Sequence, residues 1–308
     1  MEFQVLMEKM VIFVILMLIA YIMARRGILG PEFIRASSKL VIDVFMVGTI
    51  LSSMISSGAE RGLSNLGQVI LLTFLVQLLG YVVAAIAIRF VNLEENRKAP
   101  FEILMAVGNT MFIALPIADA LYGSYAVLII SLSCIAFNIL LYSYGIWKLK
   151  GKGSSSFRVR DMVSIPLIAT LLGILIIVTG FPVPGVLKSL FSALGGATMP
   201  MSMMVIGASL GTVSLLDAFR NPKFAILSAV RLILVPVLSW LICRLITDDT
   251  VLLMTCMIIA AAPSAVIITI LSIQYGRDGV FCSEGVLHST VCSMVTIPIL
   301  ISVFSHFC

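Results

Sequence analysis

The chain has 308 residues, of which 60% are hydrophobic and only 11% are charged, and its mean hydropathy is +1.16. A soluble domain carries about 25% charged residues, so this composition excludes a water-exposed globular fold and indicates that lipid is the outer solvent. The formal charge of +5 indicates basic loops that orient helices rather than a nucleic-acid-binding surface. We therefore expect an all-α membrane protein with no nucleic-acid partner.

Apolar segments long enough to cross a bilayer recur along the whole chain. A transmembrane helix needs about 20 apolar residues, and this length predicts ten spans, at residues 5–24, 38–57, 68–91, 101–121, 124–147, 162–180, 187–211, 224–247, 250–273 and 279–304. The first segment has no basic leader and no small-x-small cleavage site, so we interpret it as a retained helix rather than a signal peptide.

The basic residues predict how these spans are oriented. Loops after spans 1, 3, 5, 7 and 9 hold fifteen Lys and Arg residues, whereas the loops on the opposite side hold four. Because basic loops stay in the cytoplasm, we expect both termini to be extracytoplasmic and the protein to lie in the plasma membrane. The stretch 148–161 reads as a cytoplasmic linker between two halves, 1–147 and 162–308, with five spans each.

An odd number of spans in each half means that the second half runs through the membrane in the opposite direction. Matching helix breaks support such an inverted repeat: Gly108 and Asn109 interrupt span 4, and Pro263 interrupts span 9. Aligning the Tyr-Gly pair that ends each span places Pro263 opposite Thr110. Inverted repeats with broken helices are typical of secondary transporters.

A helix that is broken inside hydrocarbon exposes main-chain groups that lipid cannot satisfy. Such a break is tolerated only where protein or a water-filled cavity meets it, so two matched breaks predict a binding site. The half-helices that begin there would direct their positive ends towards the middle of the membrane. We therefore expect spans 4 and 9 to form a pocket that suits a carboxylate.

A set of short motifs follows one another along nearly the whole chain. They are Gly108-Asn109-Thr110, Pro116, Tyr122-Gly123, the run from Phe137 through Asn138 to Tyr142, Gly207-Ala208-Ser209-Leu210, Pro263-Ser264, Tyr275-Gly276, Ser289-Thr290 and Pro298. In this order and spacing the set resembles the auxin efflux carrier family, which includes plant auxin exporters and bacterial organic-acid permeases. The chain is closer to the bacterial type, because it lacks the long cytoplasmic loop of many plant members.

The resemblance implies a fold, a mechanism and a substrate class. Helices 1, 2, 6 and 7 would form a scaffold that often dimerises, and helices 3–5 and 8–10 would form a transport domain that moves in an elevator-type cycle. Spans 4 and 9 would be the broken crossing helices. The substrate would be a small organic anion, such as a carboxylate or an auxin-like acid, and no cofactor or metal is implied.

Polar residues at the two breaks are the candidates for substrate binding. The set comprises Gly108, Asn109, Thr110, Asn138, Pro263 and Ser264. The amide of Asn109 can donate to a carboxylate, but it can also cap the main-chain groups that the break frees, and the sequence leaves both roles open.

Four ionisable residues within the spans are candidates for coupling or counter-charge, because buried charge in a membrane is usually functional. Asp43 lies near the cytoplasmic end of span 2, and Arg231 lies deep in span 8, where it could balance Asp43, Glu284 or an anionic substrate. Glu284 and His288 are four residues apart on one helix face. They could relay protons or form a structural pair.

The sequence also contains features of other classes of protein. Gly207 to Gly211 matches the G-x-S-x-G pattern of serine hydrolases, but it lies in an apolar helix instead of a strand-to-helix turn, so close helix packing is the better account. A cation-coupled symporter of the bile-acid type, a non-transporting sensor and an intramembrane enzyme on the same fold remain alternatives to a non-enzymatic organic-anion transporter.

Overall fold

The computed structural model describes residues 2–61, 66–151 and 163–307, and within these ranges the chain is helical, without a named strand. The linker predicted at 148–161 lies outside the described residues from position 152 onwards. Six helices of the described ranges are long and apolar enough to cross a membrane: Pro31–Ser56, Leu66–Phe90, Thr110–Lys150, Gly185–Gly211, Lys223–Arg244 and Gly279–Phe304. The chain is therefore a multi-pass membrane protein.

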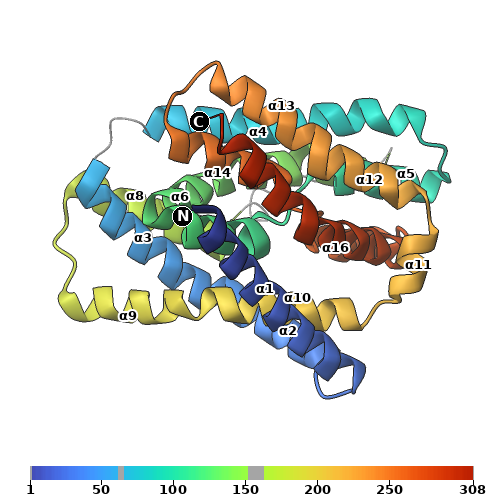
Figure 1. Ribbon diagram of the computed structural model, residues 1–308, viewed down its shortest axis with the longest axis horizontal. Coiled ribbons are helices and arrows are strands. Elements are labelled where there is room, and N and C mark those ends of the chain that lie inside the picture. The colour runs from blue at the N-terminus through green and yellow to red at the C-terminus, as the bar shows by residue number, and fades with distance from the viewer. Residues whose placement is uncertain (1, 62–65, 152–162, 308) are drawn as a thin grey trace. The chain divides into compact units, whose positions relative to one another are not determined.

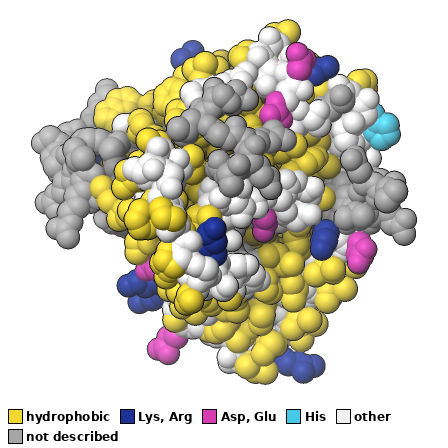
Figure 2. Space-filling model, turned by 90° about the vertical axis from the view of Figure 1, so that its left-hand side faces the viewer, with side chains coloured by type: hydrophobic (Ala, Val, Ile, Leu, Met, Phe, Trp, Pro, Cys, Tyr) yellow, Lys and Arg dark blue, Asp and Glu magenta, His cyan; other side chains and the backbone are white. Residues whose placement is uncertain are grey.

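The surface agrees with this conclusion. On the face shown in Figure 2, hydrophobic side chains cover wide areas and charged side chains are scattered singly. Many large apolar side chains are exposed, among them Phe90, Val186 and Leu245, each more than 80% accessible. Single exposed apolar residues are normal on a soluble protein, but areas of this extent need lipid or a partner to cover them.

The helices group into two compact units, which are described separately. The first comprises Met1–Leu71, Met111–Ile135 and Val163–Thr212, and the second comprises Leu72–Thr110, Ala136–Met162 and Val213–Cys308. The units cut across the two sequence halves, since each unit takes segments from both. Residues 111–135, which the sequence analysis assigned to a transport domain, group with the first unit.

Six α-helices of the described residues lie wholly in the first unit, which also takes most of α6 (Leu115–Leu140). They are α1 (Glu2–Arg25), α2 (Pro31–Leu40), α3 (Met46–Arg61), α8 (Ile165–Thr179), α9 (Gly185–Gly196) and α10 (Thr198–Gly211). Helices α1 and α10 lie side by side (Figure 1). A pair of threonines adds a polar contact within this unit, because the hydroxyls of Thr49 and Thr198 are 2.7 Å apart.

The close approach of α1 and α10 depends on a small residue, as the sequence predicted for the Gly207 motif. A Cβ at Gly207 would run into the backbone of Met17, and one at Gly211 would meet Ala24 and the backbone of Tyr21. Small residues let helix backbones approach closely in lipid, where the hydrophobic effect does not drive helices together.

Gly207→Ala is accordingly expected to destabilise the protein by about 2 kcal/mol, because the added methyl group meets backbone atoms that cannot rotate away. The measurement is thermal unfolding in detergent. Gly196→Ala is the matched control, since a Cβ at Gly196 meets open space. Equal melting temperatures for the two variants would contradict this account of the α1–α10 contact.

The second unit holds α5 (Glu95–Ala106), α7 (Ile146–Lys150), α11 (Leu215–Arg220), α12 (Lys223–Ala229), α13 (Val235–Arg244), α14 (Thr250–Ala261), α15 (Ile267–Gln274) and α16 (Gly279–Phe304). Most of α4 (Leu66–Ala87) also belongs to it. A π-helical segment, Val230–Leu234, joins α12 to α13. Proline in a helix clashes with the carbonyl four residues earlier, and the wider π turn directly before Pro236 relieves that clash.

One helix contributes residues to both units. Helix α6 (Leu115–Leu140) has a non-helical residue at Gly123, with φ 65° and ψ −155°. A positive φ of this size favours glycine, so the chain turns where the Tyr-Gly pair predicts a seam. The continuous apolar stretch Thr110–Lys150 has 41 residues, and at 1.5 Å per residue a straight helix of that length would span about 60 Å, twice the hydrocarbon layer.

Candidate functional site: two paired helix interruptions

Two helices of the second unit end part-way along their predicted spans, and the segments that follow pair with each other. Helix α5 ends at Ala106 and helical structure resumes at Thr110, whereas α14 ends at Ala261 and α15 begins at Ile267. We call the two non-helical segments, 107–109 and 262–266, the crossing. Gly108 and Ser264 form an isolated antiparallel bridge within it.

Main-chain hydrogen bonds hold the crossing together. The N–H of Asn109 donates to the carbonyl of Pro263 at 2.6 Å, and the N–H of Ala265 donates to the carbonyl of Val107 at 3.0 Å. Each interruption thus satisfies main-chain groups that the other one frees. This is how a non-helical backbone can be tolerated where water is absent.

The register of the two interruptions differs slightly from the prediction. Counted from the ends of α5 and α14, Pro263 is the residue equivalent to Gly108, since each is the second residue after its helix. Aligning the Tyr-Gly pairs instead makes Pro263 equivalent to Thr110. The reason is that the second interruption is two residues longer than the first. Proline lacks the N–H that a helix needs and restricts the residue before it, so α14 stops early and Ala262 takes an extended conformation.

The structure brings together most of the predicted substrate residues. Gly108, Asn109, Pro263 and Ser264 meet in the crossing, and Thr110 begins the next helical segment. Asn138 is buried in α6, and Asn109 is only 6% exposed. The amide of Asn109, which lies in the crossing, can hydrogen-bond a carboxylate.

Ser264 is tied into the fold more firmly than the sequence suggested. Its hydroxyl donates to the carbonyl of Leu104 at 2.8 Å, and its N–H donates to the hydroxyl of Ser289 at 3.1 Å. The serine therefore anchors the crossing to α5 and α16, and its hydroxyl proton is already used.

Arg231 is the charged residue that lies closest to the centre of this arrangement. Its guanidinium donates from Nε to the carbonyl of Ala262 at 2.8 Å, from one terminal nitrogen to Ala106 at 3.0 Å and from the other to Ile259 at 3.2 Å. The side chain is 4% exposed, and among the described residues no carboxylate pairs with it. Its partners are the carbonyl ends of α5 and α14.

A small cavity adjoins the guanidinium. Gln77, Tyr81, Gly108, Thr110 and Arg231 line it together with apolar side chains, and it has room for about one water molecule. The buried hydroxyl of Tyr81 has no hydrogen-bond partner within the described ranges. A water molecule in this place would supply one.

The remaining coupling candidates lie away from the crossing or have other partners. Asp43 is half-buried in the π-helical segment Val41–Phe45 of the first unit. Nδ1 of His288 lies 2.8 Å from the hydroxyl of Ser228 and 3.7 Å from the sulfur of Cys292. In the part of the chain that the structure describes, no hydrogen bond joins His288 to Glu284, so the proton relay stays a prediction.

Sequence reasoning missed a buried carboxylate in α5. Glu102 is 3% exposed and accepts hydrogen bonds from the Tyr144 hydroxyl at 2.6 Å and from Nζ of Lys148 at 2.9 Å. The ring of Tyr144 in turn packs edge-on against Tyr81, with centroids 5.5 Å apart. Two sequence features could have indicated this cluster. Tyr144 and Lys148 are four residues apart and therefore share one helix face, and Glu102 is a single acidic residue within an apolar stretch.

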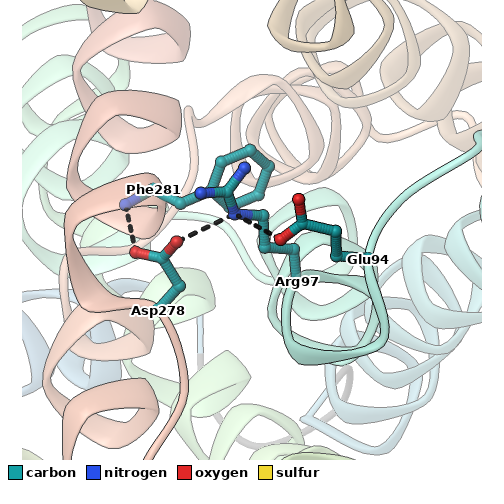
Figure 3. A network of polar contacts seen from close by, with 4 residues as sticks. All are labelled: Glu94, Arg97, Asp278 and Phe281. Atoms are coloured by element: carbon teal, nitrogen blue, oxygen red, sulfur yellow. Dashed lines mark hydrogen bonds and ion pairs between the residues drawn. The ribbon is translucent and has the colours of Figure 1, made fainter.

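A second charged cluster joins the start of α5 to the start of α16 (Figure 3). Nε of Arg97 lies 2.8 Å from the Asp278 carboxylate and 3.8 Å from Glu94, and its guanidinium stacks over the ring of Phe281. Asp278 also caps α16, because its other oxygen accepts from the N–H of Phe281 at 3.0 Å. Burial would raise the pKa of Asp278, but the hydrogen bonds from Phe281 and Arg97 outweigh it, so the pKa lies below its usual value.

This lowered pKa predicts a pH dependence of stability. Because the folded-state pKa of Asp278 lies below the unfolded value of about 4, its contribution is present above that pH and is lost as the pH falls through the folded pKa. The pair is partly exposed, so we expect only about 0.5 kcal/mol. Asp278→Asn should retain the helix cap but reduce the acid-dependent loss of melting temperature between about pH 5 and pH 2. The control is Glu95→Gln, which removes a more exposed pair and should leave that loss unchanged.

Comparison with known proteins identifies the family of this chain. A sequence model of the family described as membrane transport protein matches residues 5–158 and 154–301. The chain belongs to this family, which is of the auxin efflux carrier type, and the resemblance found in the sequence motifs is thereby confirmed.

Two archaeal relatives extend over nearly the whole chain. An uncharacterized transporter of Methanothermobacter thermautotrophicus is 23% identical over 294 residues, which cover 95% of this chain and 96% of the relative. An uncharacterized transporter of Methanocaldococcus jannaschii is 26% identical over 304 residues, covering 95% of this chain and 97% of the relative. The family and these relatives are transporters rather than enzymes.

Proposed function

We propose that this protein is a secondary transporter of small organic anions, with its substrate site at the crossing. The observation that carries the proposal is the main-chain pairing of two helix interruptions, Asn109 to Pro263 and Ala265 to Val107, in the interior of one compact unit. Interrupted helices that meet in this way mark the substrate sites of secondary transporters. The helical segment that begins at Thr110, directly after Asn109, supplies a helix N-terminus, which favours a carboxylate.

Ten spans in two inverted halves account best for the helices. Thr110–Lys150 is too long for one crossing of the bilayer and turns at Gly123, so it supplies parts of two spans. The apolar helices Val11–Arg25, Ile165–Thr179 and Thr250–Ala261 are shorter than a full span by themselves. The first and third are completed by α1 residues before Val11 and by α15, respectively.

The topology predicts opposite accessibility for two exposed positions that lie between predicted spans. Cysteines introduced at Lys98, after span 3, and at Asp248, after span 8, should react from the cytoplasmic and the extracytoplasmic side, respectively. The experiment is labelling of intact cells with a membrane-impermeant maleimide, in a background in which the native cysteines, including Cys308 at the C-terminus, are replaced by serine. Only the Asp248 variant should be modified. Labelling of both positions, or of Lys98 alone, would contradict the ten-span arrangement with both termini outside.

An elevator-type motion would move the crossing between the two sides of the membrane. In support of it, the crossing, Arg231 and the cluster around Glu102 belong to one compact unit, while α1, α2, α3, α8, α9 and α10 belong to the other. The second unit would move with the substrate. The first unit would stay fixed in the plasma membrane as a scaffold and would form the contact of a homodimer.

Flux in proteoliposomes tests the function. We expect purified protein to accelerate the movement of radiolabelled monocarboxylates, including indole acids, and to release the same compounds chemically unchanged. Thermal stabilisation in detergent by mono- and dicarboxylates at two pH values would first narrow the substrate class. Chemical conversion of the substrate would instead indicate an intramembrane enzyme, and binding without flux would indicate a sensor.

A further inference from the structure

The carbonyl ends of α5 and α14 converge on one guanidinium. Each of these helices has 12 residues, and the last carbonyls of a helix lack partners within the helix and carry roughly half a negative charge. Two such ends together carry about one negative charge. Arg231, which donates to Ala106, Ile259 and Ala262, brings one positive charge to the same place.

This balance explains how an arginine can be buried without a carboxylate. A buried charge is costly unless it is paired and hydrogen-bonded, and all three guanidinium nitrogens donate to carbonyl oxygens here. Converging carbonyl oxygens are also the ligands that alkali cations take in place of water. The guanidinium uses the oxygens that a mobile cation would otherwise need.

Gly108 provides the space for this arrangement. A Cβ on residue 108 would overlap a terminal nitrogen of Arg231 and would also press on the side chain of Ala262. The glycine that interrupts span 4 is thus required by a side chain from span 8, and Gly108 and Arg231 act as a pair.

We propose that Arg231 is the built-in cation of the crossing, that Gly108 makes room for it, and that no sodium or potassium ion binds at these carbonyl ends. The consequence for transport, that anion flux needs neither ion, rests on the proposed function. The role of Arg231 in the crossing does not.

Melting of detergent-solubilised protein without substrate tests the proposal. The wild-type melting temperature should be the same in sodium, potassium and choline chloride of equal ionic strength. Arg231→Ala should lower it by on the order of 10 °C, and guanidinium chloride at millimolar concentration should restore part of this loss whereas choline should not. The matched control is Arg244→Ala, since Arg244 bridges the exposed Asp248; it should melt near the wild type and gain nothing from guanidinium.

Three results would overturn the proposal. They are selective stabilisation of the wild type by sodium or potassium, an unchanged melting temperature of Arg231→Ala, and equal rescue by choline and guanidinium. If Arg231→Ala does not fold, the wild-type comparison still decides, together with Arg231→Lys. This variant retains the charge, and it should melt below the wild type and should not respond to sodium. Because substrate is absent, failure to observe flux would count against the transport proposal alone.

Discussion

Replacing Lys148 by methionine is expected to lower the free energy of unfolding by about 3 kcal/mol. The substitution leaves the Glu102 carboxylate, which is 3% exposed, with the Tyr144 hydroxyl but without its cation. Removing one partner of a buried ion pair typically costs about 3–5 kcal/mol. The lower end of this range is expected because the Lys148 side chain is 31% exposed, so water partly screens the pair. Chemical or thermal unfolding in detergent provides the measurement.

A double-mutant cycle separates this ion pair from other effects of the substitution. Glu102→Gln with Lys148→Met removes both charges, and we expect it to recover most of the stability that Lys148→Met loses. Lys98→Met is the matched control, because Lys98 pairs with a highly exposed Glu95 and exposed pairs contribute at most about 1 kcal/mol. Equal losses in the single and double variants would show that Glu102 is not stabilised by Lys148.

Asn109→Ala is expected to weaken the binding of a carboxylate substrate tenfold to a hundredfold. A hydrogen bond to a charged group contributes about 1.5–3 kcal/mol, which corresponds to this range of affinity. The melting temperature without substrate should change little if the amide serves the ligand. Affinity is measured by thermal shift or isothermal titration with the best substrate of the flux screen.

Two further variants serve as comparisons for Asn109→Ala. Asn96→Ala, on the exposed start of α5, should leave affinity unchanged. Pro263→Ala should let α14 extend towards the crossing and therefore reduce flux more than binding. Normal affinity in Asn109→Ala, or severe destabilisation of the substrate-free protein, would show that Asn109 caps the interrupted helix and that the substrate binds elsewhere.

Local features of the sequence predicted the ends of several helices. Apolar length and the Tyr122-Gly123 pair are properties of neighbouring residues. Helix α16 coincides with the predicted span 279–304, and α6 turns at Gly123. The interruption at Pro263 was predictable for the same reason, because proline removes a main-chain donor wherever it lies. Its register was not, because the length of the interruption depends on the segment with which it pairs.

The same distinction holds for the candidate site. Composition and motifs alone determined that the chain spans a membrane, that it belongs to a transporter family, and that Gly108, Asn109 and Pro263 mark the interruptions. Arg231 was recognisable as a costly buried charge, but its partners were not, because the carbonyls of Ala106 and Ala262 are more than 150 residues apart in sequence. Only the packing of α5, α14 and the Val230–Leu234 segment brings them to one guanidinium. Glu102 and Lys148 likewise meet only in the tertiary structure, since burial and charge pairing arise between helices rather than within them.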